Sequence, residues 1–81
     1  MKHARADYNR FQDPAGLIPD DEPVMLFRGQ DKYAARLVRT YADWVAEGGG
    51  DPEIVRVCRA HADLMDAWPK KKSPDIKQGR E

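Results

Sequence analysis

The chain has 81 residues, enough for one small domain, and its 14 basic and 14 acidic residues balance to a net charge of zero. Because a dedicated non-specific nucleic-acid binder normally carries an excess of basic residues, this balance argues against nucleic acid as the partner. The single cysteine, Cys58, excludes an internal disulfide and fits a reducing compartment. No apolar run resembles a signal peptide or approaches the ~20 residues of a membrane span, so we expect a soluble, cytoplasmic protein.

The first 30 residues predict loops with little regular structure. Residues 1–7 are charged and aperiodic, so we expect them to be disordered. Residues 13–16, Asp-Pro-Ala-Gly, have the composition of a tight turn, and residues 19–23, Pro-Asp-Asp-Glu-Pro, predict an acidic loop. Residues 24–27, Val-Met-Leu-Phe, fit either a short strand or one helical turn, because so short a run has no decisive period. Residues 8–11 are a second, weaker strand candidate.

A first helix is predicted to begin at Asp31, whose carboxylate can accept backbone N–H groups of the first turn, and to end at Gly48. Its apolar residues recur at helical spacing, and we expect Leu37 to be buried against the next helix. These residues are Ala34, Leu37, Val38, Tyr41, Ala42 and Val45.

A second helix is predicted to begin at the cap Asp51, with Pro52 in its first turn, and to stop before Pro69. Its apolar residues step by four, three, four and three, which is typical of a helix–helix contact of the coiled-coil type. This expected contact contains Ile54, Cys58, His61, Met65 and Trp68, widened by Val55, Val57, Ala62 and Leu64.

These elements predict a mainly α fold, an antiparallel two-helix hairpin that turns at residues 48–50, after an N-terminal extended or loop segment containing one or two short strands. Leu17, Ile18 and residues 24–27 would lie across the hairpin and complete its core. The domain is expected to span residues 8–68, and the polar residues 69–81 to form a disordered tail.

The only candidate for catalysis is the pair Cys58 and His61, three residues apart on one helix face. A thiolate and an imidazole form the nucleophile of many enzymes, but here both belong to the expected helix contact, where a free cysteine is usually a small buried hydrophobe. Together with His3 they give at most three metal ligands, fewer than a structural zinc site needs. We therefore expect no catalytic residue, no metal site and no cofactor.

Charged residues on the helices predict a solvated surface. Arg39 with Asp43, and Arg59 with Asp63, are spaced for ion pairs within one helix. Arg56 and Arg59 would also suit a DNA-reading helix, but acidic residues share their side of that helix. A small DNA-binding regulator is thus the weaker alternative.

Three features suggest contact with another protein. The acidic loop Asp20, Asp21 and Glu22 could meet a basic partner, and Arg28 follows it closely in the chain. Trp44 lies at the edge of its helix's apolar stripe, where it could anchor an interface or pack against residues 24–27.

Self-association is the last expectation from composition. If residues 24–27 form a strand, their apolar side chains need cover on both faces, and a second copy could bury Met25, Phe27 and Trp44 across a two-fold axis. The alternative is a monomer in which residues 8–11 pair with this strand.

Residues 18–31 read Ile-Pro-Asp-Asp-Glu-Pro-Val-Met-Leu-Phe-Arg-Gly-Gln-Asp, after the turn Gln-Asp-Pro-Ala-Gly at 12–16. This pattern resembles a family of short bacterial and phage proteins with an acidic-Pro-Val, apolar, Arg-Gly-Gln-Asp motif followed by two helices. The resemblance covers residues 8–68 and departs at residues 25–27, where Phe-Leu-Leu is expected instead of Met-Leu-Phe. It implies a common fold, brings no catalytic residues, and extends in size and character to anti-CRISPR inhibitors of the type I-C class.

The sequence therefore favours a non-enzymatic protein-binding module from a phage or mobile element, an inhibitor that blocks a host CRISPR effector complex. Its acidic residues could mimic phosphate in a basic nucleic-acid channel. Besides the DNA-binding regulator, a structural or housekeeping small protein remains open.

Overall fold

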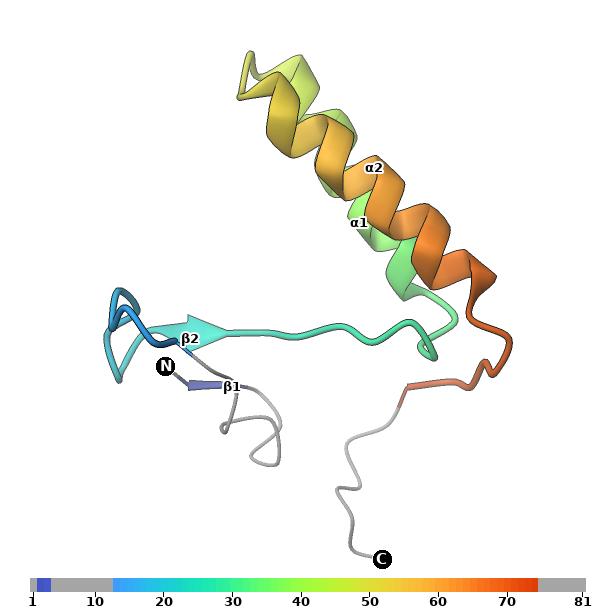
Figure 1. The fold of residues 1–81 in the computed structure, drawn as a ribbon, viewed down its shortest axis with the longest axis horizontal. Helices are drawn as coiled ribbons and strands as arrows, with labels where there is room; N and C mark the ends of the chain where they lie inside the picture. The colour runs from blue at the N-terminus through green and yellow to red at the C-terminus, as the bar shows by residue number, and fades with distance from the viewer. Residues whose placement is uncertain (1, 4–12, 75–81) are drawn as a thin grey trace, which may run out of the picture. The chain divides into compact units, whose positions relative to one another are not determined.

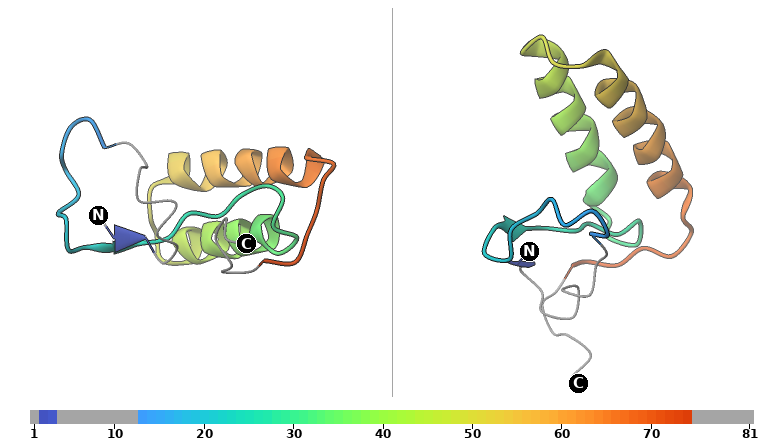
Figure 2. Two further views of the ribbon diagram at one scale, coloured as in Figure 1. Left: turned by 90° about the horizontal axis from the view of Figure 1, so that it is seen from below. Right: turned by 60° about the vertical axis from the view of Figure 1, so that its left-hand side comes forward.

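A computed structural model of the chain describes residues 2–3 and 13–74 (Figure 1). Two compact units divide them: the hairpin unit, Phe27–Pro74, and an N-terminal unit formed by the described residues that precede it. The elements are β1 (Lys2–His3), β2 (Pro23–Val24), α1 (Ala34–Glu47) and α2 (Pro52–Ala67). The predicted mainly α fold is confirmed, since α1 and α2 run side by side in opposite directions as one hairpin (Figures 1 and 2).

The N-terminal unit contains one short parallel pairing, in which Lys2 lies opposite Pro23 and His3 opposite Val24. The strand expected over residues 24–27 is thus confined to its first residue and the proline before it, and the alternative of a helical turn there is wrong. Pairing with residues 8–11 concerns a segment outside the described residues.

The predicted turn at residues 13–16 is confirmed. The Gly16 N–H donates to the Asp13 carbonyl oxygen over 3.0 Å, and Gly16 has a positive φ of 65°, which favours glycine. The Asp13 carboxylate then accepts the N–H groups of Leu17 and Ile18 at 3.3 and 2.9 Å. One aspartate therefore closes the turn through both its backbone and its side chain.

The expected cap of α2 is present, but the cap expected for α1 is wrong: α1 begins later than predicted, and its N-cap is Tyr33, which makes no side-chain cap hydrogen bond. Asp31 accepts the Tyr33 N–H on its carboxylate at 2.8 Å and the Ala34 N–H on its carbonyl at 3.1 Å, which builds a turn before the helix proper. Asp51 accepts the Glu53 N–H at 2.9 Å, as an N-cap of α2 should. At the other end of α2, Trp68 has the extended backbone that a following proline favours.

Two of the three glycines between the helices have distinct physical roles. Gly49 adopts a positive φ of 74°. Gly50 donates its N–H to the Val45 carbonyl at 2.8 Å, and a Cβ at this position would lie 2.6 Å from Val45 Cγ1. The chain thus reverses tightly because residue 49 can adopt a left-handed conformation and residue 50 has no side chain.

The contact between the helices, here called the seam, is built mainly from alanine. Small side chains let the two backbones approach closely, and every fully buried side chain in the described part of the chain is an alanine. The larger members are Val55 and Met65, each 8% exposed, with Val38 packed alongside. The buried residues are Ala34, Ala35, Ala42, Val55, Ala62 and Met65.

The predicted contact is therefore right for Met65 but rotated on both helices. Leu37, expected to be buried, is 40% exposed, and Ile54, His61 and Trp68 lie outside the seam. The prediction followed the largest apolar side chains, whereas the helices meet where the smallest ones allow close approach. Of the residues predicted to widen the contact, Val57 and Leu64 are exposed as well, while Val55 and Ala62 belong to the seam.

The apolar residues that were expected to join the hairpin's core are not buried. None of residues 13–27 is buried: Leu17 is 80% exposed, Met25 and Phe27 are also exposed, and Ile18 is half-buried. The buried cluster consists of residues from the two helices alone.

The open end of the hairpin is closed by the segment that follows α2. The Lys72 N–H donates to the Gln30 carbonyl at 2.8 Å, and the Lys32 N–H donates to the Lys72 carbonyl at 3.1 Å. Lys71 donates its Nζ to the carbonyls of Gly29 and Met65. The predicted domain end at residue 68 is therefore too early, because residues 71–72 are hydrogen-bonded to the chain entering α1.

Enlarging one seam alanine should destabilise the fold. We expect Ala62→Leu to lower the free energy of unfolding by about 1–3 kcal/mol, because the added methylenes force the backbones apart. Urea denaturation measures this change. The matched control is Ala60→Leu, the same substitution at an exposed position of α2, which should stay within about 0.5 kcal/mol of the parent. Equal effects at the two positions would contradict the assignment of the seam.

Candidate interaction surface

Ion pairs between the helices mark one side of the seam, here called the charged face. Arg39 of α1 donates from Nη2 to Asp63 and from Nη1 to Asp66 of α2, each over 2.7 Å, and Arg59 of α2 donates to Asp43 of α1 over 3.0 Å. The sequence predicted pairs within each helix, Arg39–Asp43 and Arg59–Asp63. Instead, Asp63 pairs with Arg39 and Asp43 pairs with Arg59, each across the two helices. The antiparallel arrangement allows this because it places the charged residues of α1 beside those of α2 on one side of the hairpin.

Electrostatics reinforce this arrangement. The pKa of Arg39 is raised because Asp63 and then Asp66 accept hydrogen bonds from its guanidinium. In the first turn of α2, Arg56 donates to the carboxylate of Glu53, which lowers the pKa of Glu53 and raises that of Arg56. Three of the four arginines on the helices are therefore engaged by carboxylates.

A double-mutant cycle distinguishes pairing between helices from pairing within a helix. Arg39→Ala and Asp63→Ala should be coupled in thermal stability, and the coupling should weaken as salt is raised, because the pair is exposed. Arg39→Ala and Asp43→Ala should be additive. Coupling of Arg39 to Asp43 instead of Asp63 would show that the two helices are not aligned so that Arg39 lies beside Asp63.

The opposite side of the seam carries exposed apolar residues from both helices. At 100° per residue, Leu37 and Tyr41 lie on the other side of the α1 seam from Arg39, and Val57 and Leu64 lie on the other side of the α2 seam from Arg59. Since the arginines share one face of the hairpin, these residues share the other, here called the apolar face. Its apolar members are Tyr33, Leu37, Tyr41, Trp44, Ile54, Val57, Leu64 and Trp68.

Charge is absent from the middle of the apolar face. From Ile54 to Trp68, the charged residues of α2 all project toward the charged face or directly outward, and the same holds for the charged residues of α1. Near the centre, His61 is exposed between Val57 and Leu64 and supplies a polar ring. The charged helix residues that lie outside the apolar face are Arg36, Arg39, Asp43, Glu47, Arg56, Arg59, Asp63 and Asp66.

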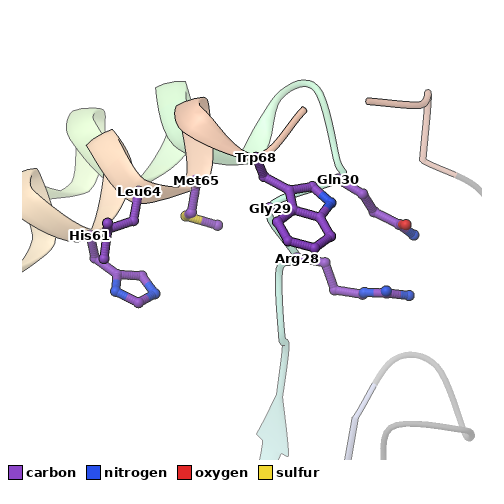
Figure 3. A pocket seen from close by; sticks show the side chains of 7 residues that line it. All are labelled: Arg28, Gly29, Gln30, His61, Leu64, Met65 and Trp68. Carbon is purple, nitrogen blue, oxygen red and sulfur yellow. The ribbon is translucent and has the colours of Figure 1, made fainter. Parts of the chain in front are cut away.

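At the open end of the hairpin, the apolar face continues into a hollow of about 340 Å³ (Figure 3). Trp68 lies against Gly29 there: a Cβ at residue 29 would stand 3.4 Å from the Trp68 Cβ, at van der Waals contact. Figure 3 shows the side chains of Arg28 and Gln30 projecting from the same chain segment beside the Trp68 indole. The walls are formed by Arg28, Gly29, Gln30, His61, Leu64, Met65 and Trp68.

The residues predicted to bind a partner are divided between the two units. Within the hairpin unit, Arg28 lines the hollow at the open end, whereas Trp44, 62% exposed, lies near the glycine turn. Asp20, Asp21 and Glu22 are exposed in a turn of the N-terminal unit, where the Glu22 N–H donates to the Pro19 carbonyl at 3.1 Å. Trp44 alone falls on the apolar face.

The predicted self-association residues, Met25 and Phe27, are exposed and outside the apolar face. Cys58 and His61 differ in burial: Cys58 is half-buried beside the seam, and His61 is exposed. Cys58 is thus less buried than its predicted core role requires.

Sequence reasoning missed most of the apolar face, although a signal was present. Ile54, Val57, His61, Leu64 and Trp68 step by three, four, three and four, as regular as the contact that was predicted. Two stripes on one helix mean that α2 can meet α1 with one and remain open on the other. Only the structure shows which stripe α1 takes.

No family model, curated protein or solved structure matches this chain. Among residues 2–3 and 13–74, no helix is long and apolar enough to cross a membrane. In that same part of the chain, no three His, Cys, Asp or Glu residues are grouped to hold a metal ion.

Proposed function

We propose that this chain is a non-enzymatic protein-binding module that docks through the apolar face of its helical hairpin. The observation that carries the proposal is the segregation of side chains on the two helices, with ion-paired residues on one face and exposed aromatic and aliphatic residues on the other. Trp and Tyr are the residues that most often dominate binding energy at protein interfaces. Trp44, Tyr41 and Trp68 on this face are all more than half exposed.

The dimensions of the face suit a protein rather than a small molecule. Its members extend along both helices, from Trp68 at the open end to Ile54 near the glycine turn. The hollow beside Trp68 is open and adjoins this face, so it suits one anchoring side chain of a larger partner.

For the partner, the resemblance of residues 18–31 to short phage proteins favours a subunit of a CRISPR effector complex. On this proposal the protein is a phage or mobile-element inhibitor that acts in the cytoplasm by covering a surface of the effector. The acidic loop, Asp20, Asp21 and Glu22, offers a second contact for a basic partner surface.

The alternative of a DNA-binding regulator has less support. Arg56 is bound by Glu53 and Arg59 by Asp43, so the two cations that could face phosphates or bases are already paired. The charge balance of the whole chain also provides no electrostatic attraction to DNA.

A phage plaque assay in cells that carry a type I-C CRISPR system tests the proposal. The parent protein should restore plaque formation, and Leu64→Lys should reduce this effect by about tenfold or more, because a charge is then buried within the interface. The matched control is Ala46→Lys, which adds the same charge at an exposed position on the charged side of α1. It should behave as the parent does.

Two other outcomes would contradict parts of the proposal. If the parent protein gives no protection, the CRISPR effector is not its target. If Leu64→Lys protects as well as the parent while the joint replacement of Asp20, Asp21 and Glu22 by Ser abolishes protection, the binding site is the acidic loop and not the apolar face.

A further inference from the structure

We infer that, in the free protein, a second copy of the chain covers the apolar face, so that two hairpins pack face to face as a four-helix assembly. This inference rests on the proposed function in that it assigns a resting occupant to the same surface. It assigns the dimer contact to the helices instead of Met25 and Phe27.

A single hairpin has a small buried core. Alanine contributes little apolar area when buried, and the seam adds only Val55 and Met65 as larger buried side chains. Two helices of 14 and 16 residues need more buried area than this to hold together.

The exposed area of the apolar face is large. The eight apolar members of the face are 40–67% exposed. With roughly 150–250 Å² for an aromatic side chain and less for an aliphatic one, these exposures amount to on the order of 700 Å². A specific interface buries about 800 Å² on each partner, whereas the largest apolar patch of a typical monomer is roughly 300–600 Å².

The apolar face is suited to pack against the same face of a second copy. On α2 it repeats with the three-four spacing of helix–helix contacts, so its natural complement is another helix pair. Two copies bring no like charges together, because the middle of the face carries no Asp, Glu, Lys or Arg. The charged faces of both copies would remain in water.

The centre of the interface can be located from the ion pairs. Arg39 lies level with Asp63, and Asp43 lies level with Arg59, so Tyr41 is level with His61 at the middle of the hairpin. A two-fold axis through the face would pass close to these two residues. Their hydroxyl and ring nitrogens can then pair across the axis, with Leu64 and Trp44 on either side.

One consequence distinguishes this arrangement from a permanently open docking face. A partner that binds the apolar face must displace the second copy, so its apparent affinity falls as the concentration of the protein rises.

Sedimentation velocity of the full chain from 1 to 100 μM tests the inference. We expect the sedimentation coefficient to rise to that of a dimer, and the thermal midpoint of unfolding to increase with protein concentration. Leu64→Lys should raise the dimer dissociation constant by at least about 30-fold, and Ala46→Lys should leave it unchanged. A clean monomer of the parent protein at 100 μM, with a concentration-independent midpoint, would overturn the inference without relying on any variant.

The two proposals fail in distinguishable ways. A monomeric parent whose plaque activity is still lost in Leu64→Lys keeps the docking face and removes the second copy. A dimer that Leu64→Lys dissociates without loss of plaque activity keeps the second copy and removes the docking face. A dimer that Leu64→Lys leaves intact, while Phe27→Asp dissociates it, would place the contact on the N-terminal segment and overturn the inference.

Discussion

The close approach of two helices over alanine determines the rest of this structure. Because Ala42 of α1 and Ala62 of α2 have no side-chain exposure, the backbones meet where side chains are smallest, and the larger residues are displaced to the flanks. Gly50 reinforces this geometry, since its contact with Val45 requires a residue without a Cβ. Packing thus decides which way each helix faces, and hydrophobicity alone does not.

That rotation produces two unlike faces. On one flank, Arg39 reaches across to Asp63 and Asp66, and Arg59 reaches Asp43, so charged side chains satisfy one another between helices. On the other flank, Trp44 and Leu64 have no such pairing and remain in contact with water. Exposed ion pairs add little to stability, but they fix the level of one helix against the other and therefore the position of both faces.

The sequence was sufficient for the local features of the fold. Asp51 caps α2, Asp31 closes the turn before α1, the glycines mark the turn between the helices and Pro69 marks the stop, because each acts through its own backbone or its nearest neighbours. The arrangement of residues far apart in the chain was less accessible. Leu37 was assigned to the core by its size, yet the competition between stripes of large and small residues is decided only when two helices meet.

The same limit applies to the candidate site. Trp44 could be identified from its place at the edge of an apolar stripe, and Arg28 from its motif. That Arg28 lies beside Trp68 depends on the hydrogen bonds of Lys71 and Lys72 to residues 29–32, which no spacing rule predicts. Leu17 and Met25, which were expected in the core, are exposed.

The two tryptophans of the chain, Trp44 and Trp68, both lie on the apolar face, so their fluorescence reports directly on whether that face is covered. The most direct measurement is acrylamide quenching of this emission as protein concentration rises from nanomolar to micromolar. Burial by a second copy should shift the emission to shorter wavelength and reduce the quenching. Emission at the wavelength of water-exposed tryptophan, with full quenching at every concentration, would contradict the account.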